Sequence, residues 1–498
     1  MCNDHIEANR AEDIYLPPKR MNPADTIFRF LKTIKETILG IGIGSLAIIR
    51  QSPKYGLLFI GAFLLILLVI SFFSWMRHTY RVEDGEFRIE KGIFVRKKSY
   101  ISINRIHKID FTANVLHRIL KLVQVSVDTA AGGSGEVLSA VTKKDADTLR
   151  NALKKVQAVE NMEPVDDVAD NDTPMYPEKK ITTGHLFIAG MTSGSAGFLI
   201  LGGLILFSQV QQFIPESVYE RTFDYLIRMS IVFIIVLLVF GLIALWGIAT
   251  IGTVIKYGGF TIEKRPDELF VKRGLLETKE LTIPYDRIQA IDVEQNILRM
   301  PFKFSRVIAI TAGSGEGMDE GNPIIFPLLP EKEIEPFLKS FVPGYDGVNQ
   351  KIIPLHKKGL KYYLVRHVLF FILALIPVMY FFPAYGWIPV VLGALSMLLG
   401  WMKFKHTGYR IDKRRIIVSN WGSFTKNRYV FDRRRVQSYQ KSQHKFQQME
   451  DLATANFSII SLNTSLRQLS DEDANLIGDW HSRRTNGETA YIHPEARE

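Results

Sequence analysis

Three arginines recur in this sequence at a fixed distance from a preceding glycine. Each stands 13 residues after its glycine, and the three pairs are Gly92 and Arg105, Gly274 and Arg287, and Gly422 and Arg435. A guanidinium group can bind phosphate or carboxylate oxygens through two parallel hydrogen bonds. The repeated arginines therefore predict one of two roles, either binding of lipid phosphate or pairing with a carboxylate inside a strand.

A second basic feature lies near the C-terminus. Between residues 403 and 445, thirteen lysines and arginines face only Asp412 and Asp432. Bases beside a membrane gain about 1 kcal/mol each from anionic headgroups, although the same residues can simply set topology. The candidates for lipid or partner binding in this segment are Arg414, Arg415, Arg433 and Arg434.

The net charge of the whole chain also indicates an anionic partner. Lysine and arginine number 62 against 51 acidic residues, which gives +11 and favours anionic lipid or nucleic acid. For a chain held in a membrane, nucleic acid is the poorer interpretation, and we expect none.

Motifs for catalysis are missing from the sequence. It has no phosphate-binding loop, no His-Glu-x-x-His and no Gly-x-Ser-x-Gly, and its histidines show no metal-ligand spacing. The single cysteine, Cys2, excludes a disulfide framework and a cysteine-based metal site. We therefore expect no enzymatic activity, no cofactor and no metal.

The basic regions are adjacent in sequence to apolar segments that are long enough to cross a bilayer. About 20 apolar residues span the hydrocarbon layer, and the candidate spans are Thr37–Ile49, Tyr55–Trp75, Leu186–Phe207, Ser230–Val254, Val368–Phe382 and Trp387–Trp401. The first is short enough to be an interfacial or re-entrant helix instead, but as a span it completes a pair, and the other spans also come in pairs. The sequence predicts six spans in three hairpins.

Flanking charges orient these hairpins. Lysines and arginines are concentrated before and after each hairpin rather than in its turn, which places the hydrophilic parts and both termini in the cytoplasm. Two Gly-x-x-x-Gly pairs, Gly40 with Gly44 and Gly190 with Gly194, predict close helix packing. The packing partner is either another helix of this chain or a second subunit.

The segments after the three hairpins repeat one pattern. Ile109-Asp110 and Asn114 of the first correspond to Ile291-Asp292 and Asn296 of the second. Alternating apolar residues predict short strands, and an amphipathic helix closes each unit. The third unit lacks the Thr-Ala-Gly strand end of the others, with Ala455-Asn456-Phe457 near that point.

This organisation resembles the bacterial pleckstrin-homology-like (PH-like) family of membrane proteins, in particular its long YdbT-like members. The Arg-Ile/Val-His/Gln stretches and the Thr-Ala-Gly strand ends carry the resemblance. It implies a membrane α-helical plus β fold, with each hairpin followed by a PH-like β-sandwich or barrel and a C-terminal helix. It also implies a shorter, single-module homologous membrane protein as a partner, with a homo-oligomer as the alternative.

The predicted domains follow the repeats. They are an N-terminal tail (1–30), hairpin 1 (31–76), module 1 (77–158), an acidic linker (159–179), hairpin 2 (180–255), module 2 (256–345), hairpin 3 (346–403), a divergent module 3 (404–484) and a C-terminal tail (485–498).

The functional hypothesis is a non-enzymatic scaffold in the cell membrane. It would present three cytoplasmic modules to protein partners and anionic lipid. The alternative is a component of a membrane defence or export system that gives resistance to antimicrobial peptides.

Overall fold

The computed structural model describes residues 16–37, 52–129, 136–149, 176–194, 231–312 and 322–482, except positions 84, 94, 104, 105, 413 and 423, together with isolated positions between 197 and 208. Arg105, Gly40, Gly44, nearly all of the first predicted span, part of the third and residues 159–175 of the acidic linker lie outside these residues.

Four helices among the described residues are long and apolar enough to cross a membrane. They comprise residues Lys54–Met76, Val232–Tyr257, Lys357–Phe381 and Pro383–His406. The corresponding helices are α3 (Pro53–Met76), α9 (Ile231–Tyr257), α11 (Leu360–Phe381) and α12 (Trp387–His406). The second, fourth, fifth and sixth predicted spans match these helices, while the shorter helix α6 (Thr183–Met191) holds the start of the third.

The chain forms two compact units, and unit 1 is built from two separate stretches of the sequence. Unit 1 comprises residues 1–176 and 270–283, and unit 2 comprises residues 177–269 and 284–498. Residues 270–283 follow the second predicted hairpin in the sequence, yet they belong to unit 1 with the first module.

Unit 1 contains two antiparallel sheets. The first has the order β1-β2-β3-β4, with strands Leu16–Arg20, Thr79–Glu83, Glu86–Lys91 and Lys97–Ser102. The second runs β7-β6-β5-β11-β10, with strands Glu136–Thr142, Leu122–Thr129, Ile106–Ala113, Thr278–Pro284 and Glu268–Arg273. Helix α4 (Val115–Ile119) follows β5. Phe87, Ile89, Val125, Leu138 and Leu149 form part of the core between the sheets and the helix over residues 143–149.

Unit 2 contains a large sheet and a three-stranded sheet. The large sheet has the order β14-β13-β12-β18-β17-β16-β15, with strands Ile324–Pro330, Phe304–Thr311, Ile288–Asn296, Thr425–Asp432, Arg415–Trp421, Gly408–Ile411 and Ile353–Pro354. The small one has the order β19-β20-β21, with strands Val436–Ser442, Leu452–Ile459 and Leu462–Ser470. Strand β8 (Glu178–Lys180) pairs with β9 (Thr261–Lys264).

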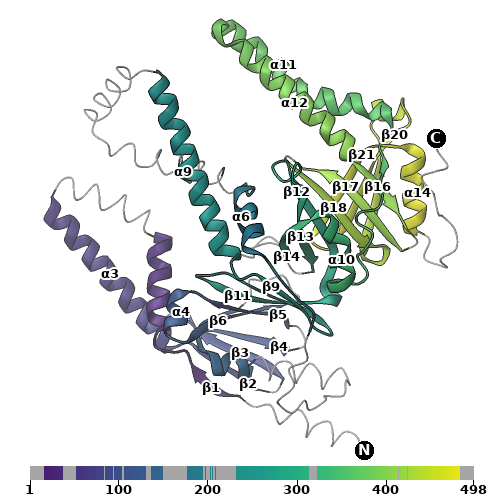
Figure 1. Ribbon diagram of the computed structural model, residues 1–498. Coiled ribbons are helices and arrows are strands. Elements are labelled where there is room, and N and C mark those ends of the chain that lie inside the picture. The colour runs from purple at the N-terminus through teal and green to yellow at the C-terminus, as the bar shows by residue number, and fades with distance from the viewer. Residues whose placement is uncertain are drawn as a thin grey trace, which may run out of the picture. The chain divides into compact units, whose positions relative to one another are not determined.

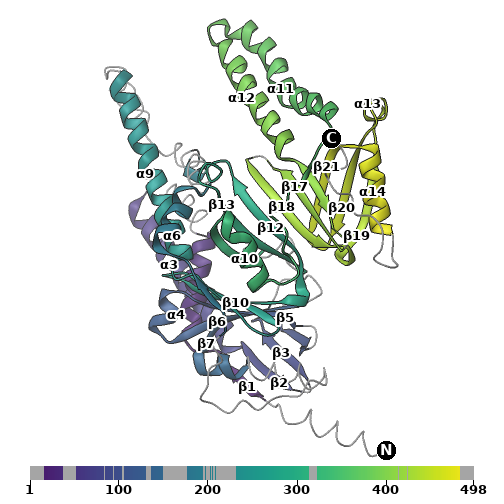
Figure 2. The same cartoon turned by 45° about the vertical axis from the view of Figure 1, so that its right-hand side comes forward.

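Helices close the β modules of unit 2 and join them to the membrane. The closing helices are α10 (Glu331–Phe341) and α14 (Asp471–Ser482), which has Ala474, Ile477 and Trp480 in the core of the third module. Short helices are η3 (Tyr285–Arg287), η4 (Lys357–Gly359), η5 (Pro383–Tyr385), η6 (Arg433–Arg435) and α13 (Lys445–Gln448). Figures 1 and 2 show α14 along the sheet β19-β20-β21.

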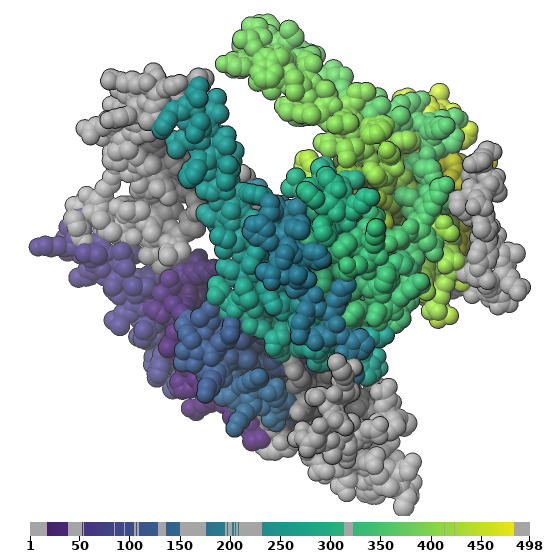
Figure 3. Space-filling model, in the orientation of Figure 1, coloured from purple at the N-terminus to yellow at the C-terminus, as the bar shows by residue number. Residues whose placement is uncertain are grey.

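Helices α11 and α12 form an antiparallel pair joined by η5 (Figure 1). None of the α11 residues is buried, and the pair projects from the β sheets of unit 2 with its apolar side chains on the surface (Figure 3). Large apolar side chains are left exposed along a whole helix pair where lipid rather than water surrounds it.

The third module differs from its relatives at the strand end named above. Strand β20 corresponds to β13, so the counterpart of Thr311 is Ile459, and a two-residue turn at Ile460 and Ser461 leads directly into β21. Ser461 there has a positive φ of 63°. Ala455-Asn456-Phe457 lie inside β20, shortly before this strand end.

Glycine 190 brings helix α6 close to α9. A Cβ atom added there would lie 2.9 Å from the carbonyl oxygen of Thr250, whereas one added at Gly194 would meet nothing within 4 Å. We expect Gly190→Ala to lower the free energy of unfolding by about 1–3 kcal/mol, because the two backbones must separate. The thermal midpoint of the full-length protein in detergent measures this change. Gly194→Ala is the matched control and should stay within about 0.5 kcal/mol.

A candidate membrane-interface site in each repeat

An eight-residue segment follows the long strand of each repeat, at residues 114–121, 296–303 and 444–451. We call these segments the junction turns. The first residue of each caps the turn: Asn114 accepts a hydrogen bond from the backbone N–H of His117 (3.1 Å), Asn296 from that of Arg299 (2.9 Å) and His444 from that of Gln447 (3.2 Å). Such a cap satisfies an amide that would otherwise lack a partner.

The last residue of each junction turn also adopts the same backbone conformation in all three repeats. Lys121, Lys303 and Asp451 have φ values of 55°, 54° and 57°, which place them in the left-handed region that most side chains avoid. The three repeats share this uncommon conformation at one position although their sequences there differ. The junction turn is therefore an architectural element of the repeat.

Each junction turn presents an apolar side chain to its surroundings at the third position. Leu116, Leu298 and Phe446 are 42%, 55% and 69% exposed. Further exposed apolar residues lie beside them, namely Val115, Ile119, Leu120, Phe302 and Met449. Exposed apolar patches of this kind mark a surface that contacts a membrane or another protein.

Contacts with helices place the junction turns at the ends of the membrane-associated segments. In unit 1, the ring of His117 stacks on Phe28, in the helix over residues 25–37, with centroids 3.9 Å apart. In the third repeat, the Tyr362 hydroxyl at the start of α11 donates to the carbonyl oxygen of Phe446 (3.0 Å). The apolar side chains are thereby held where a spanning helix begins.

Arg299 makes the corresponding contact in the second repeat. It is 8% exposed, and it donates to the Thr192 hydroxyl (3.0 Å), the Ala189 carbonyl (3.4 Å) and the Pro327 carbonyl (3.5 Å). Asn296 donates to the Thr192 carbonyl oxygen (2.6 Å). A cation at the C-terminal carbonyls of a helix such as α6 stabilises that helix end. Burial lowers the pKa of Arg299 to about 10, so it stays charged at neutral pH.

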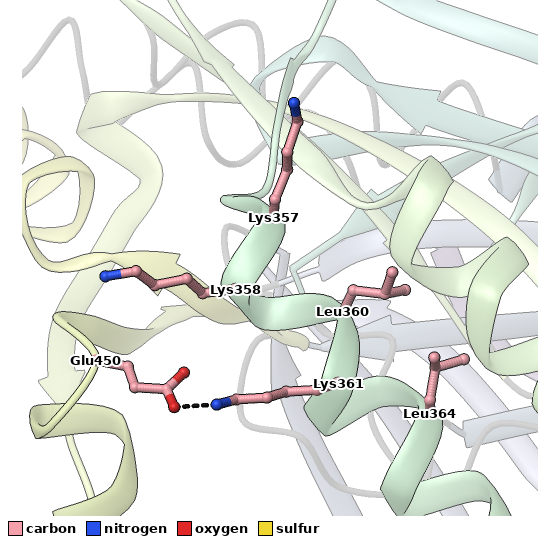
Figure 4. Close-up of a pocket in the computed structure, with 6 residues that line it drawn as sticks. All are labelled: Lys357, Lys358, Leu360, Lys361, Leu364 and Glu450. Atoms are coloured by element: carbon pink, nitrogen blue, oxygen red, sulfur yellow. Dashed lines mark hydrogen bonds and ion pairs between the residues drawn. The ribbon is translucent and has the colours of Figure 1, made fainter.

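A lysine-lined hollow lies beside the third junction turn. It has a volume of about 560 Å³ and is lined by Lys357, Lys358, Leu360, Lys361, Leu364 and Glu450. Figure 4 shows Lys361 paired with Glu450, while Lys357 and Lys358 extend away from that carboxylate. Three cations beside two leucines at the start of a spanning helix form a surface suited to an anionic headgroup and the adjoining acyl chain.

The arginines proposed from the sequence occupy other positions. Arg287 and Arg435 end the equivalent helices η3 and η6, and both approach Asp286: Arg287 lies 3.5 Å from its carboxylate, and Arg435 donates to its carbonyl oxygen (3.0 Å). Arg414 pairs with Asp432, and Arg415 with Asp346.

The remaining two arginines of this group lie next to each other in η6. Arg433 donates to the Trp480 carbonyl oxygen (3.3 Å), and the backbone of Arg434 donates to Asp432 (2.9 Å). None of the arginines in the described part of this set lines the lysine hollow.

A buried polar network in unit 1 was missed by sequence reasoning. Asp25 is fully buried, and Arg29 donates to its carboxylate (2.6 Å), to the Ser74 hydroxyl (2.9 Å) and to His78. Burial would raise the pKa of Asp25, but its contacts with His78 and the charge of Arg29 hold that pKa below its usual value. The network ties the helix over residues 25–37 to the end of α3, and its members are too far apart in sequence to be recognised by spacing.

In the described ranges, no group of three or more His, Cys, Asp or Glu side chains could hold a metal ion.

The repeated β modules and apolar helices define a membrane protein with several pleckstrin-homology (PH) domains. The bacterial PH domain model matches residues 28–157, 196–340 and 368–485, so the chain belongs to this family. The resemblance inferred from the repeats is confirmed.

A curated relative is similar in sequence to this chain over nearly the whole length of both proteins. The chain is 31% identical over 486 residues to the UPF0699 transmembrane protein YdbT of Bacillus subtilis (strain 168), with 93% of this chain and 98% of that relative covered. The chain is thus a transmembrane protein of the PH domain family.

Proposed function

We propose that the protein is a non-enzymatic membrane scaffold that holds PH-like modules against the lipid surface. Six spans in three hairpins carry three modules on the cytoplasmic side, with both termini in the cytoplasm. The modules offer surfaces to protein partners, including a shorter single-module homologous membrane protein, and to anionic lipid.

The observation that carries this proposal is the junction turn. In each repeat it contacts a helix at the membrane-associated end and leaves an apolar side chain exposed, at Leu116, Leu298 and Phe446. A module that was only tethered by its membrane helices, without touching the lipid surface, would need neither the exposed apolar side chain nor the repeated cap. Apolar anchors combined with nearby lysines support docking onto an anionic leaflet.

The lysine hollow gives the sharpest test of lipid binding. We expect Lys357→Gln with Lys358→Gln to reduce the retention of phosphatidylglycerol roughly 20- to 30-fold, since each base near the surface contributes about 1 kcal/mol. The measurement is energy transfer from the full-length protein to headgroup-labelled phosphatidylglycerol in mixed phosphatidylcholine nanodiscs, at low salt.

A matched control removes the same charge elsewhere. Lys143 and Lys144 are neighbouring exposed lysines on the helix that closes the first module, and replacing both by glutamine should leave phosphatidylglycerol retention unchanged. If both double variants bind this lipid as the parent does, the hollow is not a lipid site.

A further inference from the structure

Neighbouring repeats are joined by strand pairing, and the two joints are equivalent. Strand β5 of the first repeat pairs with β11 of the second, and β12 of the second pairs with β18 of the third, both antiparallel. We call each such pair a seam. Phe111 lies opposite Glu280 in the first seam and Val293 opposite Arg428 in the second. These are corresponding positions of the repeats, so the register is the same in both seams.

The third repeat carries the next half of this interface, on a strand that no second strand covers in the described part of the chain. Strand β19 is its counterpart of β5 and β12, and among the described residues it pairs only with β20, at the edge of its sheet. The first six residues of β12 are all buried, whereas in β19 only Val436 is buried. Gln437, Ser438, Gln440 and Ser442 of β19 are exposed.

The first repeat carries the complementary half. Strand β4 is the counterpart of β11 and β18, and within the described residues it pairs only with β3, at the edge of its sheet. Lys97, Lys98 and Tyr100 are exposed there. Among the described residues, the first repeat therefore has an unpaired strand edge at β4, and the last repeat has the complementary unpaired edge at β19.

We propose that β19 of one copy of this protein pairs with β4 of a second copy, antiparallel and in the register of the two seams. This register places Tyr439 opposite Tyr100 and Gln440 opposite Ser99. Strand addition to a sheet edge gains main-chain hydrogen bonds along its whole length, and the pairing is head-to-tail, so it builds a ring or a row of copies.

Side chains at the two edges agree with this pairing. Gln440 in β19 corresponds to Asp292, which is buried in the second seam. The amide of Gln440 is uncharged and costs less to bury than a carboxylate. The register also brings Lys441 opposite Lys98, but both already have acidic partners, Asp471 at 2.6 Å and Glu90 at 3.7 Å. Two neutralised lysines do not repel each other as bare charges do.

Disulfide trapping in native membranes tests the pairing. Two differently tagged full-length chains, both carrying Cys2→Ser to remove the only cysteine, are co-expressed, one with Ser99→Cys and the other with Gln440→Cys. Directly opposed residues lie within the reach of a disulfide, and we expect at least tenfold more cross-linked product than with Ser99→Cys and Gln437→Cys, whose Cα atoms the register sets about 10 Å apart.

Each outcome decides the proposal. A cross-link between the two tags at the matched pair alone supports it. Equal cross-linking of the matched and mismatched pairs, or none, overturns it, as does a cross-link that joins Gln440→Cys to a different polypeptide in place of the second copy. Lipid binding plays no part in this readout, so the lipid proposal and the pairing proposal can fail separately.

Discussion

Replacing Arg299 by leucine is expected to lower the free energy of unfolding by about 3–5 kcal/mol, because several buried acceptors lose their donor at once. The guanidinium donates to the Thr192 hydroxyl and to the Ala189 and Pro327 carbonyls. Leucine fills part of the volume but leaves these oxygens buried without a donor, at about 1–3 kcal/mol for each unsatisfied group. The thermal midpoint of the full-length protein in detergent should fall clearly.

Two further variants separate the hydrogen bonds from the charge. Arg299→Lys keeps the positive charge but loses the planar guanidinium group with its several donors. The stability of this variant should therefore lie between that of Arg299→Leu and that of the parent protein. Arg287→Leu is the matched control, because Arg287 is partly exposed and its carboxylate neighbour is 71% exposed; it should change stability by less than about 1 kcal/mol. An Arg299→Leu protein as stable as the control would refute the role given to this arginine.

The contribution of Asp292, in the second seam, to the free energy of unfolding should fall as the pH rises from about 4 to 7. Burial raises the pKa of Asp292 to about 7, against a hydrogen bond from the Asn427 amide (2.7 Å). The folded protein then keeps a proton that the unfolded chain has already released. The penalty is absent below about pH 4, grows through this window and is complete above pH 7, where it reaches the order of 4 kcal/mol.

Asparagine at position 292 imitates the protonated carboxyl group. We expect Asp292→Asn to remove this part of the pH dependence and to be more stable than the parent at pH 8 but not at pH 4, measured as the difference between their thermal midpoints. Asp286→Asn, at an exposed carboxylate, should follow the parent at both pH values. A constant difference between Asp292→Asn and the parent across this range would contradict the assignment.

The membrane segments and the strands were largely predictable from the sequence. Charge-free apolar stretches such as Tyr55–Trp75 have no alternative to a spanning or buried helix, and α3 covers this stretch. The spacing between Gly274 and Arg287 indicates the repeat because one strand of fixed length, β11, and the short helix η3 separate the glycine from the arginine. The glycines at 92 and 274 adopt φ values of 114° and 104°, which explains why glycine stands at both positions.

The site was less predictable, since its parts are defined by contacts between distant residues. The equivalence of Asn114 and Asn296 was visible, but not that each caps a junction turn, because His444 serves the same role in the third repeat with a different side chain. Nothing in the sequence indicates that Arg299 reaches Ala189 and Thr192. The lysines of the hollow were read as flanking charges that orient the fifth span.

The assignment of residues 270–283 to unit 1 has a consequence for synthesis of the protein. Strand β5 leaves the ribosome well before β11, and helix α9 must be made in the interval. At about 5–20 residues per second, the edge of β5 waits roughly 8 to 30 seconds for its partner, a period in which it is open to aggregation. Maturation of the first unit is therefore coupled to insertion of the next membrane segment, and a ribosome that stalls before β11 leaves a nascent chain with an incomplete sheet.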